Sequence, residues 1–164
     1  MAEELFDDPR ITAMGLFSEA FVGLTARLSC QIARHGLSMI EFEVLIRLGR
    51  SPDGQLRMTD LSAQTSLTAS GVTRVIDRLE RDGYVSRMAC PTDRRSLYAV
   101  VTRSGRDRLA AILPEHIELI DEWFTGRLNP QDLEATLSGL RTVRDAVRPG
   151  AEAGALTTAG AHDA

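Results

Sequence analysis

The sequence predicts a mainly helical fold that carries one small β-hairpin. Most of the chain repeats apolar residues every three or four positions, which is the pattern of amphipathic helices. Two strand-like segments, 84–88 and 97–101, flank a polar turn. With 164 residues, 43% of them hydrophobic and only 5% aromatic, the chain suits one domain of helices packed on helices.

The first two predicted helices occupy residues 10–35 and 38–49. Gly36 ends the first, and Ser38 with Glu41 has the spacing of a capping box that starts the second. Spacings of three and four define one apolar stripe on the first helix, formed by Ile11, Met14, Phe17, Phe21, Leu24 and Leu28.

Residues 59–82 predict two short helices joined by a tight turn. Thr59 is the expected N-cap of the first and Thr68 that of the second. The second helix buries one apolar face and exposes arginines on another. This arrangement is typical of a helix-turn-helix, in which the second helix enters the major groove of DNA. The buried face is formed by Val72, Val75, Ile76 and Leu79.

The hairpin that follows directly has an arginine-rich turn, as expected of a wing that touches the neighbouring groove. Thr102 then caps a long helix, and Asn129-Pro130 starts the last one. The sequence therefore predicts a single winged helix-turn-helix domain between two tails. We expect an N-terminal tail at 1–9, the domain at 10–148 with its DNA-binding part at 38–102, and a disordered tail at 149–164.

The net charge of −4 is unevenly distributed along the chain. Between Arg74 and Arg108 nine arginines face five acidic residues, a net charge of +4, whereas the remainder carries −8. A basic segment within an acidic chain is expected where DNA phosphates are contacted.

Other classes of protein find little support in these residues. There is no glycine-rich phosphate loop, metal-ligand spacing or nucleophile motif, so we expect neither an enzyme nor a metal or other cofactor. No run approaches the ~18 apolar residues of a membrane span, and the N-terminus lacks a signal peptide, which favours the cytoplasm. Cys30 and Cys90 are expected to be separate reduced thiols, with Cys30 in the core.

The segment Asp93-Arg94-Arg95-Ser96, placed between two strands, resembles the wing signature of the MarR (multiple antibiotic resistance regulator) family of transcriptional regulators. Residues 67–79 resemble that family's recognition helix. The resemblance covers roughly 10–148 and is specific within 59–105. It implies a homodimer in which residues 10–35 and 103–148 interlock, and in which each winged part reads half of a pseudo-palindromic operator.

Ten residues are candidates for contacting double-stranded DNA. Hydroxyls in the first turns of the recognition helix can meet phosphates, and an outward arginine can bind guanine. The alternative for the helix arginines is solvated surface, paired with Asp77 or Asp82. The resemblance implies that Arg95 enters the minor groove and is oriented by Asp93, unless the two form only a structural turn. The candidates are Thr59, Ser62, Thr68, Ser70, Thr73, Arg74, Arg78, Asp93, Arg94 and Arg95.

The resemblance also implies a small aromatic or phenolic effector that releases a repressor from DNA. Relatives bind such molecules between the dimer helices and the winged domain. Each candidate lining residue has the alternative of ordinary packing, and an effector-independent architectural or dimerisation module is the alternative function. The peroxide-sensing branch of the family carries its reactive cysteine near the start of the first helix. This chain has no cysteine there, which argues against regulation by thiol oxidation. Candidate pocket residues are Arg27, His35, Arg47, His116 and Trp123.

Overall fold

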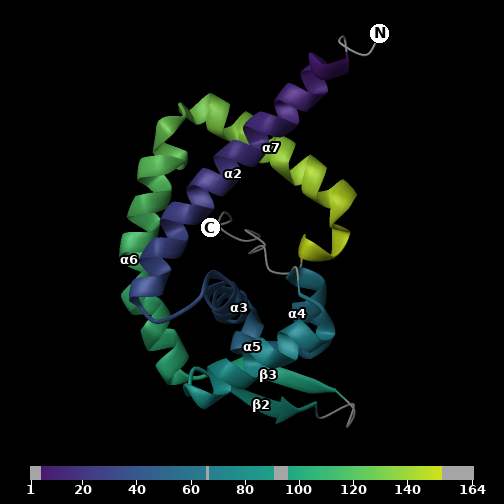
Figure 1. Cartoon of the computed structure of the whole chain (residues 1–164). Helices are drawn as coiled ribbons and strands as arrows, with labels where there is room; N and C mark the ends of the chain where they lie inside the picture. The colour runs from purple at the N-terminus through teal and green to yellow at the C-terminus, as the bar shows by residue number, and fades with distance from the viewer. Residues whose placement is uncertain (1–4, 66, 91–95, 153–164) are drawn as a thin grey trace, which may run out of the picture.

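The computed structural model describes residues 5–65, 67–90 and 96–152 (Figure 1). It is mainly helical with a small antiparallel sheet, which confirms the predicted fold class. The helices are α2 (Pro9–Arg34), α3 (Met39–Arg50), α4 (Met58–Gln64), α5 (Ala69–Arg81), α6 (Arg103–Trp123) and α7 (Pro130–Val147). Short 3-10 turns are η1 (Pro52–Gly54), η2 (Thr125–Arg127) and η3 (Pro149–Glu152).

The sheet contains β1 (Gln55–Arg57), β2 (Val85–Ala89) and β3 (Leu97–Val101), in the order β1-β3-β2. The sequence analysis missed β1, because three residues without alternating burial carry no strand pattern. Pairing with β3, with Leu56 opposite Ala99, creates this strand. The hairpin strands lie as predicted, with β2 shifted by one residue toward the C-terminus.

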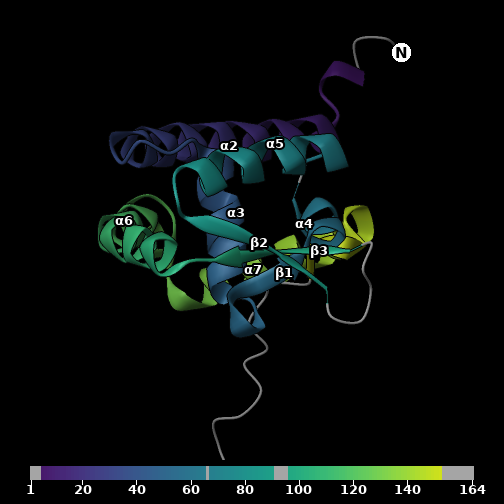
Figure 2. The ribbon, with the colours of Figure 1, turned by 90° about the horizontal axis from the view of Figure 1, so that it is seen from below.

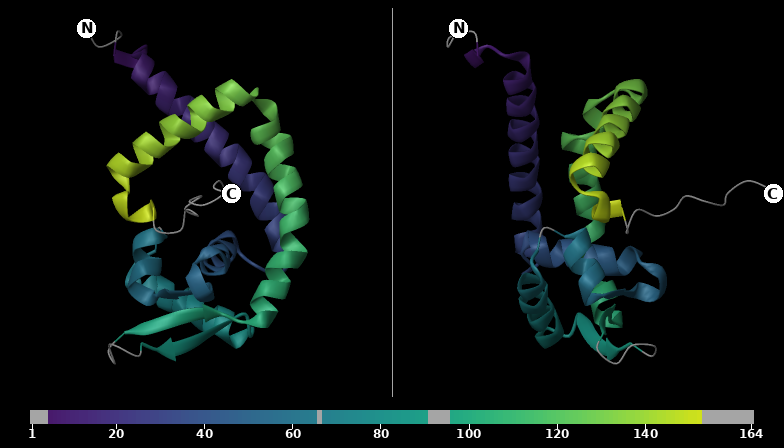
Figure 3. Two further views of the ribbon diagram at one scale, coloured as in Figure 1. Left: turned by 180° about the vertical axis from the view of Figure 1, so that it is seen from behind. Right: turned by 90° about the vertical axis from the view of Figure 1, so that its right-hand side faces the viewer.

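The molecule consists of a small winged part and two long arms. Helices α3, α4 and α5 surround the sheet in the winged part (Figure 2). Helices α2 and α6 leave it in the same direction and pack side by side near the winged part, and α7 then turns back (Figure 3). The end of α7 and the η3 turn lie beside α4.

Side chains cap most of the helices at the residues predicted from sequence. Ser38 and Glu41 form the expected capping box, because the Glu41 amide donates to Ser38 Oγ and the Ser38 amide to Glu41 Oε2. The prediction for Thr59 is wrong: α4 begins at Met58 with Arg57 as its N-cap residue, so Thr59 lies within the helix, and no side chain caps α4. Further predicted caps are confirmed at Thr68, Thr102 and Asn129.

One apolar core joins the arms to the winged part. Ile32 from α2 and Leu109 and Ile112 from α6 meet the buried faces of α3 and α5. Cys30 is exposed, so its predicted place in the core is wrong. Two residues span about 200° on a helix, which places Cys30 opposite the buried Ile32. Cys90 is buried, and its Sγ lies 3.8 Å from the hydroxyl oxygen of Tyr98.

The C-terminal arm returns to the winged part through a hydrogen bond from an arginine side chain to a backbone carbonyl. Arg148 donates from Nη2 to the carbonyl of Thr65, at the end of α4, over 2.6 Å. The η3 turn follows, within the segment 149–164 that was expected to be a disordered tail. The rest of that segment, 153–164, lies outside the described residues.

A buried polar pair joins the two arms, because Gln31 of α2 meets Ile112 and His116 of α6. Gln31 donates from Nε2 to the Ile112 carbonyl, so its Oε1 is the acceptor for Nδ1 of His116, 3.0 Å away. The imidazole packs on the ring of Phe42 with centroids 4.6 Å apart and is only 7% exposed. Burial lowers the pKa of His116 below its ordinary value of 6.5.

We expect His116 to make the fold sensitive to acid. The unfolded chain takes up a proton near pH 6.5, whereas the folded chain does so only at lower pH, so the free energy of unfolding falls as pH drops below about 6.5. Thermal unfolding at pH 7.5 and 5.5 should show a larger fall in Tm for wild type than for His116→Gln. An equal fall in both proteins would show that His116 is not responsible.

Candidate nucleic-acid interface

Helix α5 presents one apolar and one polar face. Val72, Val75, Ile76 and Leu79 are buried against the core, in the predicted spacing of three and four. The opposite face, formed by Ser70, Arg74, Asp77 and Arg81 with Thr73 on its flank, is exposed. A helix anchored along one side and polar along the other can be laid into a groove of DNA without disturbing the core.

Hydroxyl groups gather at the N-terminus of α5. Thr68 Oγ1 accepts from the Gly71 amide at 3.2 Å and lies 3.1 Å from Ser70 Oγ. Thr73 is exposed but donates its hydroxyl hydrogen to the Ala69 carbonyl at 3.0 Å. Thr68 and Ser70 therefore lie where the free amides and partial positive charge of a helix N-terminus attract a phosphate.

The two candidates on α4 occupy different environments. Ser62 is half-buried and donates to the Leu67 carbonyl at 3.0 Å, so it closes the turn between α4 and α5. Thr59 is exposed, and its hydroxyl lies 3.4 Å from Asp60 Oδ1. Ser62 thus shapes the turn, whereas Thr59 keeps an accessible hydroxyl.

Arg74 and Arg78 differ although they are one helical turn apart. Arg74 is exposed and makes no hydrogen bond or ion pair with any described residue. Arg78 Nε lies 3.0 Å from Oε1 of Glu41, whose other oxygen accepts from Ser38 in the capping box. The partner expected for Arg78 was Asp77 or Asp82, but Glu41 of α3 takes that place. This ion pair ties α5 to α3 and leaves Arg74 accessible.

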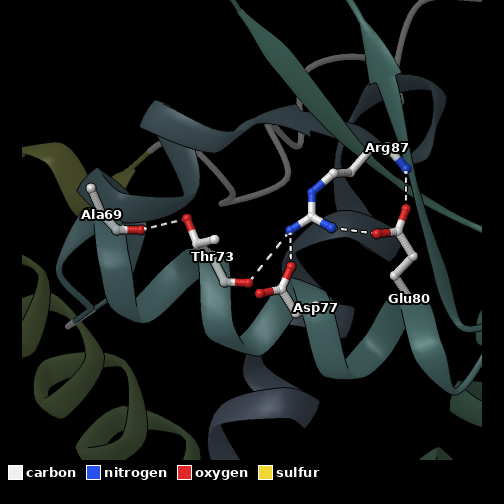
Figure 4. A network of polar contacts seen from close by, with 5 residues as sticks. All are labelled: Ala69, Thr73, Asp77, Glu80 and Arg87. Carbon is white, nitrogen blue, oxygen red and sulfur yellow. Dashed lines mark hydrogen bonds and ion pairs between the residues drawn. The ribbon is translucent and has the colours of Figure 1, made fainter.

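A network around Arg87 connects β2 to α5 (Figure 4). Its Nη2 lies 2.6 Å from Asp77 Oδ1 and 3.5 Å from the Thr73 carbonyl, and its Nη1 is paired with Glu80. Its backbone amide also donates to Glu80, at 3.1 Å. Burial opposes the charge of Arg87, but hydrogen bonds to Asp77 and Glu80 outweigh burial and raise the pKa of its guanidinium.

The strands of the hairpin are antiparallel up to Ala89 and Leu97. The Cys90 amide continues the pairing by donating to the Ser96 carbonyl at 3.0 Å. The candidate wing residues Asp93, Arg94 and Arg95 fall in 91–95, outside the described residues. The structure therefore describes the strands on both sides of the wing turn.

A cavity of about 440 Å³ lies between α2 and the turn from α6 to α7. Arg27 lies over the ring of Trp123, 3.7 Å from its centroid, and Arg127 is 5.0 Å from the same centroid. Two guanidinium groups and an indole thus face one space. Other lining side chains include Leu24, Phe124 and Leu128.

Only two of the five predicted effector residues line this cavity. Arg27 and Trp123, 96 positions apart in the sequence, come together there. His116 lies in the core instead, because Gln31 and Phe42 enclose it. His35 ends α2, and Arg47 is paired with Glu43 on α3 at 2.9 Å, so neither lies at the cavity.

Sequence reasoning missed Glu41 and Arg87 as parts of this interface. Glu41 was recognised only as a capping residue, and its contact with Arg78 spans 37 positions. Arg87 follows the buried Val85 by two residues in β2, so period-two alternation places both on the side of the sheet that faces α5. That alternation was the available signal for Arg87. Within the described ranges, no group of three His, Cys, Asp or Glu residues could hold a metal ion.

Comparisons with known proteins agree with this geometry. A family model described as MarR family matches residues 35–96. The HTH-type transcriptional regulator MhqR of Bacillus subtilis is 31% identical over 128 residues, which cover 78% of this chain and 86% of the relative.

Solved structures extend the likeness to the arms. A MarR family regulator from Streptomyces coelicolor, solved in complex with DNA, has a TM-score of 0.81 at 28% identity and covers 87% of this chain and 93% of its own. BpsR of Bordetella bronchiseptica, whose DNA binding is regulated by 6-hydroxynicotinic acid, has a TM-score of 0.70 at 26% identity, covering 80% and 91%. The chain therefore belongs to the MarR family of winged helix-turn-helix, DNA-binding transcriptional regulators, which are not enzymes.

Proposed function

We propose that this regulator is a cytoplasmic homodimeric repressor that binds a pseudo-palindromic operator. The observation that carries the proposal is the outward face of α5, where Arg74 is exposed and unpaired among the described residues. The opposite face of α5 is fixed in the core, so this arginine is held on a rigid element. The Streptomyces relative solved with DNA supports the same use of the fold.

Each part of the interface has a proposed role. Arg74 reads a base edge in the major groove, and Thr68 and Ser70 bind phosphate at the N-terminus of α5. Thr59, on α4, contacts the sugar-phosphate backbone of the DNA. Thr73, with its donor committed to Ala69, offers a methyl group and an acceptor, and Arg78 contributes charge from beside Glu41.

For the wing, the proposal rests on the sequence motif. Arg95 enters the minor groove, where a narrow groove concentrates negative potential. Asp93 orients its guanidinium through a charge-assisted hydrogen bond, and Arg94 meets phosphate. The paired strands β2 and β3 would hold this turn beside α5.

Selection from random DNA tests the proposed function. The full-length protein is incubated with a pool of random duplexes, and bound DNA is amplified and sequenced. We expect enrichment of an inverted repeat whose half-sites are about one helical turn apart, on neighbouring major grooves. Enrichment of no sequence, or of a single unrepeated half-site, would contradict a dimeric sequence-specific regulator.

The arms supply the proposed dimer surface. Several large apolar side chains in the first half of α2 are at least half exposed, including Phe17 at 50% and Phe21 at 60%. Val143 and Val147 on α7 are 59% and 70% exposed. Soluble monomers rarely leave such contiguous apolar surface in water. A second copy that interlocks its own arms with these would cover both surfaces.

Among the described residues, α2 is the one helix with the length and hydropathy of a membrane span, with 26 residues and an 18-residue window of mean hydropathy 1.2. Its last turns, however, belong to the core of the winged part, where Gln31 and Ile32 are buried. Glu19 and Arg27 would also be costly in hydrocarbon. We therefore propose a partner copy, not a membrane, as the cover of α2.

We further propose that an aromatic acid or phenol bound in the α2–α6–α7 cavity weakens DNA binding. Arg27 stacks on Trp123 and makes no hydrogen bond with any described residue, so its donors can receive a carboxylate. Apolar side chains such as Phe124 would contact the ring. The regulation of BpsR by 6-hydroxynicotinic acid gives the first compound to try.

Trp123 is the only tryptophan in the chain, so its fluorescence reports on this cavity. We expect 6-hydroxynicotinic acid to quench it saturably and to weaken operator binding. Losing hydrogen bonds to a charged group costs about 1.5–3 kcal/mol, so Arg27→Ala should weaken ligand binding about 10- to 150-fold. Arg141→Ala, which removes a distant exposed arginine, is the control. If no aromatic acid or phenol changes operator affinity, the effector-independent architectural role is favoured instead.

A further inference from the structure

Arg87 occupies an unusual position between the wing and the recognition helix. It belongs to β2, yet its guanidinium bonds only to groups of α5 among the described residues, namely Asp77, Glu80 and the Thr73 carbonyl (Figure 4). Its side chain is only 22% exposed, whereas those of Asp77 and Glu80 are 50% and 40% exposed. The arginine is thus committed to the helix, while the two carboxylates extend toward solvent.

The carboxylates of Asp77 and Glu80 lie on the side of α5 where they would repel DNA phosphates. Asp77 follows Arg74 by three residues and Ser70 by seven, so it lies on the same outward face. DNA that meets this face brings phosphates close to both acids, and like charges repel strongly in a partly dehydrated interface. Arg87 lies between the two carboxylates and offsets one of their negative charges before DNA arrives.

We infer that Arg87 is a positioning residue for DNA recognition, which holds β2 against α5 and masks the carboxylates of Asp77 and Glu80 without contacting DNA itself. This inference rests on the proposed DNA-binding function of α5. Both terminal nitrogens of Arg87 already have acceptors on α5, one on Asp77 and one on Glu80. The backbone amide of Arg87 also donates to Glu80, which gives three links between β2 and α5. The paired strand β3 transmits this position to the wing, since Ala99 lies opposite Arg87.

A double-mutant cycle separates this role from a direct contact with phosphate. The full-length protein is titrated with its selected operator as wild type, Arg87→Met, Asp77→Asn/Glu80→Gln and the triple variant. Coupled groups interact by amounts equivalent to roughly 2- to 150-fold. We expect Arg87→Met to weaken binding about 10-fold or more in the wild-type background but much less in the Asp77→Asn/Glu80→Gln background, because the negative charges that Arg87 masks are then absent.

The salt dependence of binding provides a second readout. A lost phosphate contact lowers the slope of log K against log salt by about 0.9. We expect the triple variant to keep the wild-type slope, because Arg87 contacts no phosphate. Arg141→Ala, which removes the same charge from the exposed side of α7, is the control and should bind like wild type.

Each outcome bears on a different claim. A cycle without coupling, together with a slope reduced by about one, would overturn the inference while the proposed function stands. A wild-type protein that prefers no duplex would instead overturn the proposed function, and the inference with it. If Arg87→Met unfolds, the comparison of wild type with Asp77→Asn/Glu80→Gln still tests the masking of the two acids. Operator binding by Asp77→Asn/Glu80→Gln that is more than about 10-fold tighter than that of wild type would show that Arg87 does not mask them.

Discussion

Glutamate at both Phe17 and Phe21 is expected to convert the proposed dimer into a monomer. The two rings lie 6.4 Å apart on the exposed apolar face of α2 and would be buried against a second copy. Loss of each phenyl ring removes roughly 1.5–3 kcal/mol of stabilisation from apolar burial in the dimer. The carboxylate that replaces each ring adds the cost of an unpaired buried charge. The dimer should weaken by at least about 100-fold, which light scattering at micromolar concentration would detect.

The matched control is Ala26→Glu, which places a carboxylate on the opposite face of the same helix from Phe17. It should remain dimeric. DNA binding provides an additional measurement, because a monomer loses the advantage of two linked half-sites, which is worth about 100-fold or more. A stable, folded wild-type monomer at micromolar concentration would remove the basis for the dimer.

Arg74→Ala is expected to relax the sequence preference of the protein at one position in each half-site. A bidentate arginine–guanine contact discriminates against other bases by about 1–3 kcal/mol, or about 5- to 150-fold. The rest of α5 should stay in place, since Arg74 has no partner among the described residues whose loss would disturb the fold. Titrations with operators substituted at each position would locate the affected base.

The pattern of loss distinguishes base contact from phosphate contact. Compared with Arg74→Ala, the Arg74→Lys variant should recover affinity for DNA but not selectivity for the base. Lysine keeps the positive charge but lacks the planar guanidinium fork that binds guanine through two hydrogen bonds. Equal weakening on every duplex, accompanied by a lower salt slope, would assign Arg74 to the phosphate backbone instead.

Local signals made most of the fold predictable from sequence. Caps at Ser38, Thr68, Thr102 and Asn129 and the regular apolar stripes depend on residues within one or two turns of each other. Glycine also contributed, since Gly36 ends α2 with a φ of 74° that other residues rarely adopt. Strand β1 was not predicted from sequence, because its pairing with β3 defines it and its own composition does not.

The site could be predicted only where one element carries it. The outward face of α5 followed from helical spacing, but the contacts of Arg78 with Glu41 and of Arg87 with Asp77 depend on how α3 and β2 pack on that helix. Among the effector candidates, Arg27 and Trp123 meet because α2 passes the end of α6. No local pattern contains that information.

Titration of the full-length protein with two duplexes at one salt concentration tests the central claim most directly. One duplex carries the selected inverted repeat, and the other has both half-sites scrambled at the same base composition. Two chains per duplex and an affinity at least about 1,000-fold tighter for the repeat are expected of a dimeric operator-binding regulator. Equal affinity for both duplexes would contradict sequence-specific recognition by α5.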